Sequence, residues 1–124
     1  MTNIEIFSAY LPYEVKCRFN YEDYKLYSTC NDEEHPVVIC NNKGEALPAI
    51  WQVKLILKPL DVIDWHKVEK GMGEFLTGDM IEFIWNTERS SFHILDAPYL
   101  LVQWLIKNHY DVFGAIEKGI AISE

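Results

Sequence analysis

Residues 13–20 read Tyr13-Glu14-Val15-Lys16-Cys17-Arg18-Phe19-Asn20. Apolar and polar residues alternate through the whole stretch, which is the two-residue period of a strand with one buried face. A turn is predicted at residues 21–23, and residues 24–30 predict a second strand because they are rich in aromatic and β-branched side chains. The stretch therefore predicts a β-hairpin and places a sheet at the centre of the fold.

The rest of the N-terminal part extends this sheet and adds one helix. Residues 37–40 and 51–57 predict two further strands, while Pro48 leaves residues 45–50 as at most a sheet edge. Thr2 and Glu5 have the spacing of a capping box, which predicts a helix with Ile4, Phe7 and Leu11 on one face, ended by Pro12. We expect one helix and a meander of about four antiparallel strands, curled like a small barrel.

After residue 60 the hydrophobic period becomes helical. Asp61 is placed to cap a short helix that ends at Gly71-Met72-Gly73. Residues 74–92 fit a helix or a strand, and residues 79–85 favour a helix. Asp96 is placed to cap a helix near residues 97–109, whose apolar residues cover most of its circumference, so we expect it to be largely buried at the centre of the core.

The C-terminus predicts a last short helix at residues 111–118, stopped by Gly119, and a return of residues 120–122 to the sheet. We find no linker, repeat or low-complexity tract. The sequence therefore predicts a single α+β domain spanning residues 1–124.

Composition narrows the classes of function. The chain has 124 residues, is 49% hydrophobic and carries a net charge of −8. Residues 1–50 contain eight acidic and four basic residues, and residues 51–124 contain eleven and seven, so both parts are acidic. Without a basic stripe, direct binding to a nucleic-acid backbone or an anionic membrane is not expected, whereas a basic partner would be attracted.

Cysteine usage and hydropathy predict where the protein resides. Cys17, Cys30 and Cys40 form an odd set without a CxxC pair, as expected for reduced thiols. The N-terminus lacks the basic and apolar regions of a signal peptide, and the apolar stretch at residues 97–106 is half the length of a membrane span. We expect a cytoplasmic protein.

Three groups of residues were considered for chemistry, and each has a simpler structural interpretation. Cys17, Cys30, His35 and Cys40 could supply zinc ligands, but they lack the closely spaced pairs of structural zinc sites. The two other groups are Asp61-Asp64-His66, interpreted as a helix start, and Ser91-His93-Asp96, interpreted as a polar loop before a helix. We therefore expect no catalytic residues, no metal and no cofactor, and we do not expect an enzyme.

Two surface features suit a binding role. Aromatic residues cluster with carboxylates around the first hairpin, and an acidic loop is expected at the other end of the same sheet. This combination would suit a partner rich in Arg or Lys, although a solvated hairpin explains it as well. The candidate partner-binding residues are Tyr21, Glu22, Asp23, Tyr24, Tyr27, Asp32, Glu33 and Glu34.

Residues 9–16, 55–61 and 108–122 resemble a loose family of short uncharacterised proteins encoded by bacteriophages and prophages. The last stretch, which contains His109-Tyr110-Asp111-Val112-Phe113-Gly114, carries most of the likeness, whereas residues 66–95 diverge and Lys58 stands where Arg is usual. No activity is attached to the family. The resemblance implies that the protein is a viral accessory protein. The matching motifs are of the kind that shape a fold, and they do not mark a functional site.

The leading hypothesis is a phage accessory protein that acts in the host cytoplasm and binds a host protein or protein–RNA complex with a basic surface. Inhibition of a defence nuclease, in the manner of an anti-CRISPR protein, is its most concrete form. One alternative is a phage structural or assembly protein, which would form concentration-dependent oligomers. A second alternative is a small enzyme whose site is assembled only in three dimensions.

Overall fold

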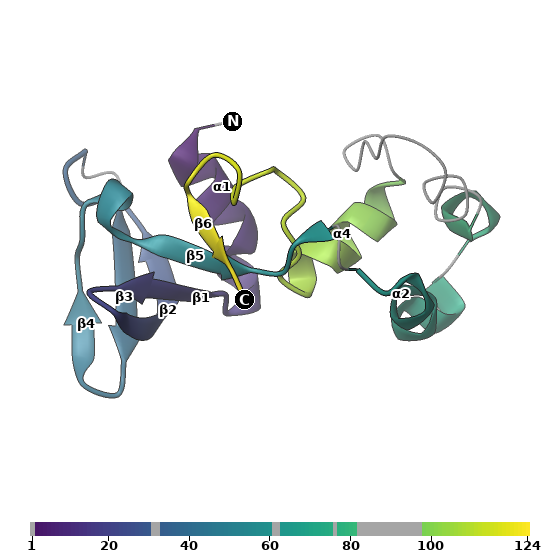
Figure 1. The fold of residues 1–124 in the computed structure, drawn as a ribbon, viewed down its shortest axis with the longest axis horizontal. Helices are drawn as coiled ribbons and strands as arrows, with labels where there is room; N and C mark the ends of the chain where they lie inside the picture. Colours follow the sequence, from purple (N-terminus) through teal and green to yellow (C-terminus); the bar gives the residue numbers. More distant parts are fainter. Residues whose placement is uncertain (1, 31–32, 61–62, 76, 82–97) are drawn as a thin grey trace.

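The computed structural model describes residues 2–30, 33–60, 63–75, 77–81 and 98–124. It has helices at both ends of the chain and a six-stranded mixed sheet, so the predicted α+β class is confirmed. In Figure 1 the sheet lies on one side, α1 in the middle, and α4 and α2 on the other side. The elements are α1 (Asn3–Tyr10), η1 (Leu11–Tyr13), β1 (Lys16–Phe19), β2 (Glu22–Thr29), β3 (Val37–Asn41), β4 (Gly44–Ala46), η2 (Ile50–Gln52), β5 (Lys54–Leu57), α2 (Trp65–Met72), η4 (Gly73–Phe75), α4 (Tyr99–Lys107) and β6 (Ala121–Ser123).

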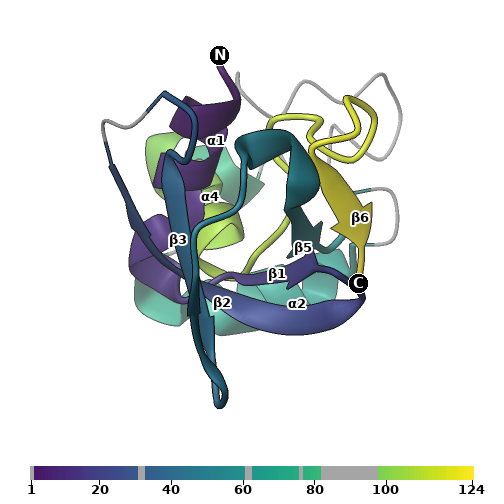
Figure 2. The same cartoon turned by 90° about the vertical axis from the view of Figure 1, so that its left-hand side faces the viewer.

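The sheet order is β4-β3-β2-β1-β5-β6. β1 to β4 form an antiparallel meander. β5, which contains the strand predicted at residues 51–57, joins β1 antiparallel, and β6 pairs with β5 in parallel. The sheet curls around α1 (Figure 2), but the pairings among the described strands leave β4 and β6 at the edges, so the curl is an open one.

Two strand starts differ from the prediction because short turns precede them. η1 contains Pro12, and Glu14 adopts a left-handed conformation with φ of 54°, so β1 begins at Lys16 and not at Tyr13. η2 likewise delays β5 until Lys54. Of the sheet edge expected at residues 45–50, only residues 45 and 46 are in a strand, the three-residue β4, which begins at Gly44.

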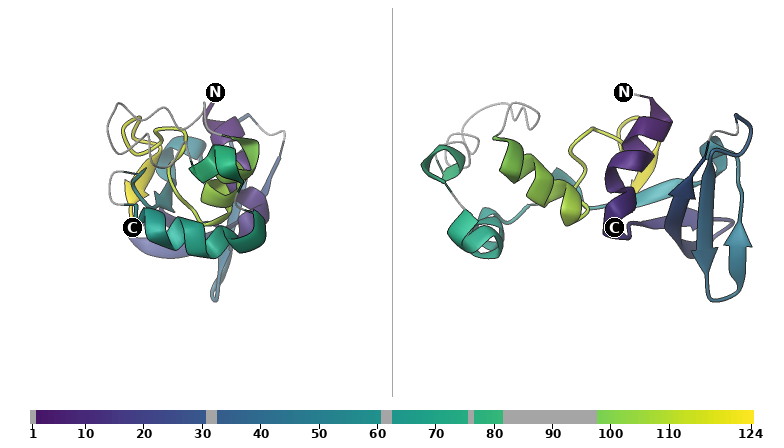
Figure 3. Two further views of the ribbon diagram at one scale, coloured as in Figure 1. Left: turned by 90° about the vertical axis from the view of Figure 1, so that its right-hand side faces the viewer. Right: turned by 180° about the vertical axis from the view of Figure 1, so that it is seen from behind.

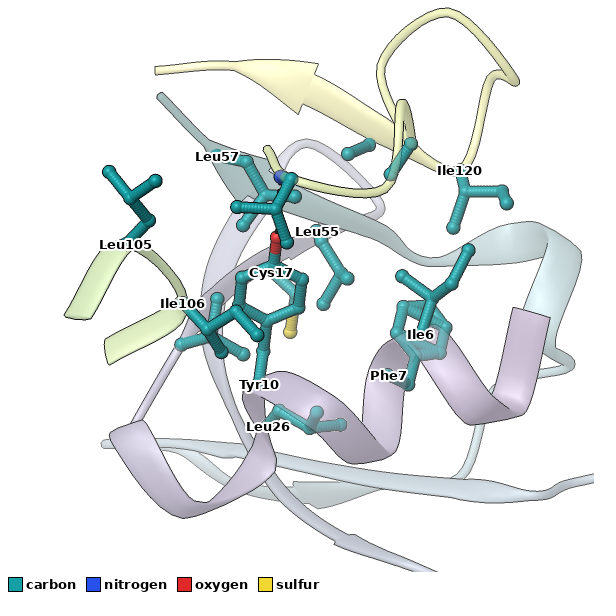
Figure 4. Packing of buried hydrophobic residues seen from close by; sticks show 14 of the residues in the cluster. Ile6, Phe7, Tyr10, Cys17, Leu26, Leu55, Leu57, Leu105, Ile106 and Ile120 are labelled. Atoms are coloured by element: carbon teal, nitrogen blue, oxygen red, sulfur yellow. Dashed lines mark hydrogen bonds between the residues drawn. The ribbon is translucent and has the colours of Figure 1, made fainter. Parts of the chain in front are cut away.

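The core lies between α1 and the concave face of the sheet (Figure 4). α1 starts with the predicted capping box, in which the Thr2 hydroxyl accepts from the Glu5 backbone N–H at 3.3 Å. Its buried residues are Ile6, Phe7 and Tyr10. These are the largest fully buried side chains of the described residues, so α1 and not α4 supplies the centre of the core.

The helix predicted near residues 97–109 is α4, and it is buried on one face only. Leu101, Leu105 and Ile106 are buried, but Tyr99 is 72% exposed and Leu100 is 49% exposed. Its N-cap position is Pro98, and the predicted cap at residue 96 lies outside the described residues. α4 is therefore amphipathic, not buried all round.

α2 packs beside α4, as the end-on view in Figure 3 shows. Its N-cap is Asp64, whose carboxylate accepts from the His66 backbone N–H at 3.0 Å, while the predicted cap at residue 61 lies outside the described residues. Gly73, with φ of 53°, ends the helix as expected. Residues 78–81 are helical, in line with the weak prediction for residues 79–85, whose remainder lies outside the described residues.

The last short helix predicted at residues 111–118 is wrong, because this segment forms turns. The buried Asp111 carboxylate accepts from two backbone N–H groups, those of Ala115 at 2.7 Å and Ile116 at 3.0 Å. Gly114, inside the predicted helix, adopts a φ of 69°, which a regular helix does not contain. The predicted return to the sheet is correct and forms β6.

Candidate binding surface

The β1–β2 hairpin turns at Asn20 and Tyr21, one residue earlier than predicted. Both residues have positive φ, 52° and 64°, as a two-residue type I′ turn requires. Such turns favour glycine at the second position, and a non-glycine residue there costs about 1 kcal/mol. Tyr21 nevertheless occupies it with its side chain 100% exposed. This tyrosine contributes no packing to the fold, yet the turn presents its whole ring to solvent.

The carboxylates beside Tyr21 lie at the start of β2, and both are ion-paired. Glu22 lies 2.9 Å from Lys43 Nζ, and Asp23 lies 3.1 Å from Arg18 Nε. The hydrogen bond from Lys43 lowers the pKa of Glu22, and the same contact raises the pKa of Lys43. The expected acidic hairpin is therefore locally neutralised. The exposed ion pairs add little stability, but they orient the side chains around the turn.

Next to this turn the outer side of the sheet is hollowed over a volume of about 830 Å³, here called the hairpin hollow. Four cationic and two acidic residues line it, so its net charge is +2. Because the whole chain has a net charge of −8, the residues outside the hollow carry −10. All four basic residues of the first fifty line it, against two of the seven acidic residues described in that stretch. The lining residues are Lys16, Arg18, Tyr21, Glu22, Asp23, Tyr24, Lys25, Cys40, Asn41, Asn42 and Lys43.

The structure describes seven of the eight candidate residues and places them toward different ends of the sheet. Tyr21, Glu22, Asp23 and Tyr24 all line the hairpin hollow. Tyr27 is 62% exposed on β2, at a register shift in the pairing with β3.

Glu33 and Glu34 are exposed in the loop that joins β2 to β3, and Asp32 lies outside the described residues. β2 is eight residues long, which is about 25 Å. The acidic loop is thus at the other end of the sheet, as predicted, and forms no single patch with the hairpin.

Lys16, Arg18, Lys25 and Lys43 are the part of this surface that sequence reasoning missed. The alternating stretch contains the first two of them, and their outward positions were predictable from its period. The sequence did not show the pairing register, which brings together cations from two strands, β1 and β2, and from the turn between β3 and β4.

The cysteines are dispersed over the sheet. Cys17 is fully buried, its thiol donates to the Tyr24 carbonyl at 3.7 Å, and burial raises its pKa to about 12. Such a thiol is a core hydrophobe and not a nucleophile. Cys30 is exposed and donates to the His35 carbonyl at 3.1 Å, while Cys40 is half-buried in the hairpin hollow.

Within the described ranges, no group of three or more His, Cys, Asp or Glu side chains is placed to hold a metal ion. Asp64 caps α2, whereas Asp61, Ser91, His93 and Asp96 lie outside the described residues. In that same part of the chain, no helix has the length and apolar character needed to cross a membrane.

The C-terminal stretch that carries the phage resemblance has structural contacts at several of its residues. The Tyr10 hydroxyl donates to the Tyr110 carbonyl at 2.5 Å and accepts from the Val112 N–H at 3.2 Å. Burial raises the pKa of Tyr10 well above its usual range, which keeps the hydroxyl neutral and able to donate. His109 Nε2 lies 2.6 Å from the Tyr13 carbonyl oxygen, so this nitrogen carries the proton and donates. These contacts join α1 to the C-terminal segment and leave the binding surface elsewhere.

In comparisons with known proteins, no family model, curated protein or solved structure matches the chain. The likeness to phage proteins therefore stays a prediction.

Proposed function

We propose that this chain is a phage or prophage accessory protein that acts by binding a host protein or protein–RNA complex. The supporting observation is Tyr21, a fully exposed tyrosine held at positive φ where glycine would be more stable. Residues that break a local rule of the fold without a structural gain are candidates for function. Tyrosine is also among the residue types most common at binding hot spots.

The electrostatics support a partner with a basic surface and one preferred orientation. The chain outside the hairpin hollow carries −10, which attracts a cationic partner over a distance, while the hollow itself is positive. Opposite charges at the two ends of the sheet would align a complementary partner before contact. The nucleic-acid groove of a defence nuclease is a basic surface of this kind. Inhibition of such a nuclease is therefore the form of the proposal to test first.

Replacing Tyr21 with glycine should separate binding from stability. We expect Tyr21→Gly to raise the free energy of unfolding by about 1 kcal/mol, because glycine suits the turn. Affinity for the partner should fall about 30-fold, the effect of losing a 2 kcal/mol hot spot. The measurements are urea denaturation, and affinity purification from a host carrying its defence systems with quantitative mass spectrometry.

The matched control is Tyr99→Ala, which removes a tyrosine that is 72% exposed on α4, in the other half of the molecule (Figure 1). It should leave partner recovery unchanged. Full recovery of every partner by Tyr21→Gly would reject Tyr21 as the contact. Oligomers that grow with concentration in the purified protein would instead favour the assembly alternative.

The acidic loop tests whether the protein imitates nucleic acid. Reversing Asp32, Glu33 and Glu34 to lysine should weaken inhibition of the defence nuclease and reduce the dependence of binding on salt, because screened charge attraction is lost. The measurement is the affinity at two ionic strengths. Unchanged affinity and salt dependence would remove the mimicry form of the proposal while leaving the hairpin contact in place.

A further inference from the structure

Lys16 of β1 and Lys25 of β2 face each other directly across the hairpin. The neighbouring pair, Val15 and Leu26, is joined by a backbone hydrogen bond of 3.0 Å, which makes Lys16–Lys25 the closely spaced, non-hydrogen-bonded kind of pair. In such pairs the Cα atoms are about 4.5 Å apart, and like charges directly opposite each other are destabilising. A cross-strand pair of lysines therefore opposes the fold that contains it.

The chain compensates its other cations in the hairpin hollow but not these two. Arg18 and Lys43 each have a carboxylate partner at 3.1 Å and 2.9 Å. Lys16 and Lys25 form no ion pair with any residue that the structure describes. Both line the hollow, beside the amide side chains of Asn41 and Asn42. Two exposed lysines at directly opposed positions are thus open to a ligand, at a place where the fold would be more stable without one of their charges.

We propose that Lys16 and Lys25 form a subsite for the carboxylates of an acidic peptide segment on the protein partner. The inference deepens the function proposed above and rests on it, since the subsite adjoins Tyr21 in the same hollow. Two close ammonium groups suit neighbouring carboxylates, and the asparagine amides can bond the peptide backbone.

A peptide fits this surface better than a nucleic acid does. A long polyanion leaving the hollow would run over a chain that carries −10 elsewhere, including the exposed Glu45 on β4, which is paired with Cys40 of the hollow. A short acidic segment within a partner whose overall surface is basic avoids this repulsion. It would also fix the orientation of that partner on the sheet.

The test is Lys25→Glu, which converts the repelling pair into a Lys16–glutamate ion pair. The probe is a fluorescein-labelled decapeptide of alternating glutamate and serine, with binding followed by anisotropy at low ionic strength. We expect the dissociation constant to rise at least about tenfold, as for loss of a charge-assisted hydrogen bond. The melting temperature should rise by about 2 °C, because the cross-strand repulsion is removed.

Lys67→Glu is the matched control, since it makes the same charge change at an exposed position on α2, outside the hollow. It should change the dissociation constant by less than about twofold. Lys16→Gln should weaken the peptide without forming a new ion pair, which separates loss of the ammonium from gain of a carboxylate.

Three results would overturn the subsite. They are no binding of the peptide by the wild type, equal binding by Lys25→Glu, and tighter binding of a single-stranded oligonucleotide of the same length. None of these affects the Tyr21→Gly comparison. If Tyr21→Gly loses the cellular partner while Lys25→Glu keeps the peptide, the proposed function stands and only the subsite is rejected.

Discussion

Replacing Asp111 with alanine should lower the free energy of unfolding by about 3 kcal/mol, because one buried and one part-buried backbone N–H lose their acceptor. The carboxylate is 8% exposed and accepts from the backbone N–H groups of Ala115 at 2.7 Å and Ile116 at 3.0 Å. The Asp111 backbone N–H also donates to the Lys58 carbonyl at 2.9 Å, so the same residue ties the turn to the end of β5. Alanine leaves that backbone bond in place but removes both bonds to the carboxylate. The measurement is urea denaturation followed by tryptophan fluorescence.

Two variants make the comparison specific. Asp111→Asn keeps one acceptor oxygen and should lose about half as much stability. Glu117→Ala removes an exposed acid from the same turn and should change stability by less than about 0.5 kcal/mol. If Asp111→Ala unfolds at the same urea concentration as Glu117→Ala, the two backbone N–H groups have other acceptors and the role assigned to Asp111 is wrong.

The failed helix prediction at residues 111–118 comes from the same residue. An aspartate followed by apolar residues at helical spacing resembles a helix start. Here the carboxylate bonds N–H groups four and five residues on, beyond the reach of an ordinary N-cap to its second or third residue. The left-handed φ of Gly114, 69°, then prevents a regular helix. Local pattern cannot reveal this, because Asp111 is held by β5, more than fifty residues earlier in the chain.

The β-meander, in contrast, was predictable because its signal is local. The alternation through residues 13–20 predicts which side chains are buried, and Val15 and Cys17 are both fully buried as that period requires. Helix ends were predictable for the same reason at Thr2, where the cap and its partner are three residues apart. The buried face of α1 was predictable only at Phe7, which is buried as expected. Ile6 and Tyr10 are buried as well, whereas Ile4 and Leu11 are half-buried, because the position of the sheet decides which side of the helix is covered.

The sequence predicted the aromatic and acidic residues of the candidate surface but not its cations, because the hairpin turn begins one residue earlier than predicted. A turn at residues 21–23 would place Lys16 opposite Ser28, whereas the observed turn at Asn20 and Tyr21 places it opposite Lys25. Register depends on turn geometry, and a small slip changes every cross-strand pair. Lys43 comes from a different hairpin, 21 residues from Glu22, so no reading of the first hairpin alone could have shown that ion pair.

The net charge of the whole chain gave no indication that the hairpin hollow is positive. A net charge of −8 with an acidic excess in both parts indicates an acidic protein throughout, but folding collects the basic residues of the N-terminal part in one hollow. Tyr21 and the Lys16–Lys25 pair share a second property there: glycine at one and glutamate at the other would each suit the fold better. Two unrelated local costs in a single hollow are the strongest structural reason to look for a ligand in it.

The helical half of the molecule depends on one close approach between α2 and α4. The Trp104 indole of α4 stacks on Tyr110, with ring centroids 6.2 Å apart, and Lys58 Nζ lies 5.3 Å from the Tyr110 ring centroid. A Cβ atom built on Gly71 of α2 would lie 2.6 Å from Trp104 Cζ2, closer than real Cβ atoms come. Because Tyr110 covers one face of the indole, a side chain at residue 71 would have to displace a stacked ring.

Gly71→Ala should therefore destabilise the protein by about 2 kcal/mol, since overpacking outweighs the gain in helix propensity of about 1 kcal/mol. Gly78→Ala is the matched control: it lies in the helical residues 78–81 with nothing within 4 Å of its added Cβ, so it should be neutral or stabilising by about 0.5 kcal/mol. Trp104→Leu should rescue Gly71→Ala in a double-mutant cycle by removing the ring that the methyl group meets. Urea denaturation of the four variants and the wild type measures these differences. Equal stability of Gly71→Ala and Gly78→Ala would mean that α2 and α4 do not approach each other at this glycine.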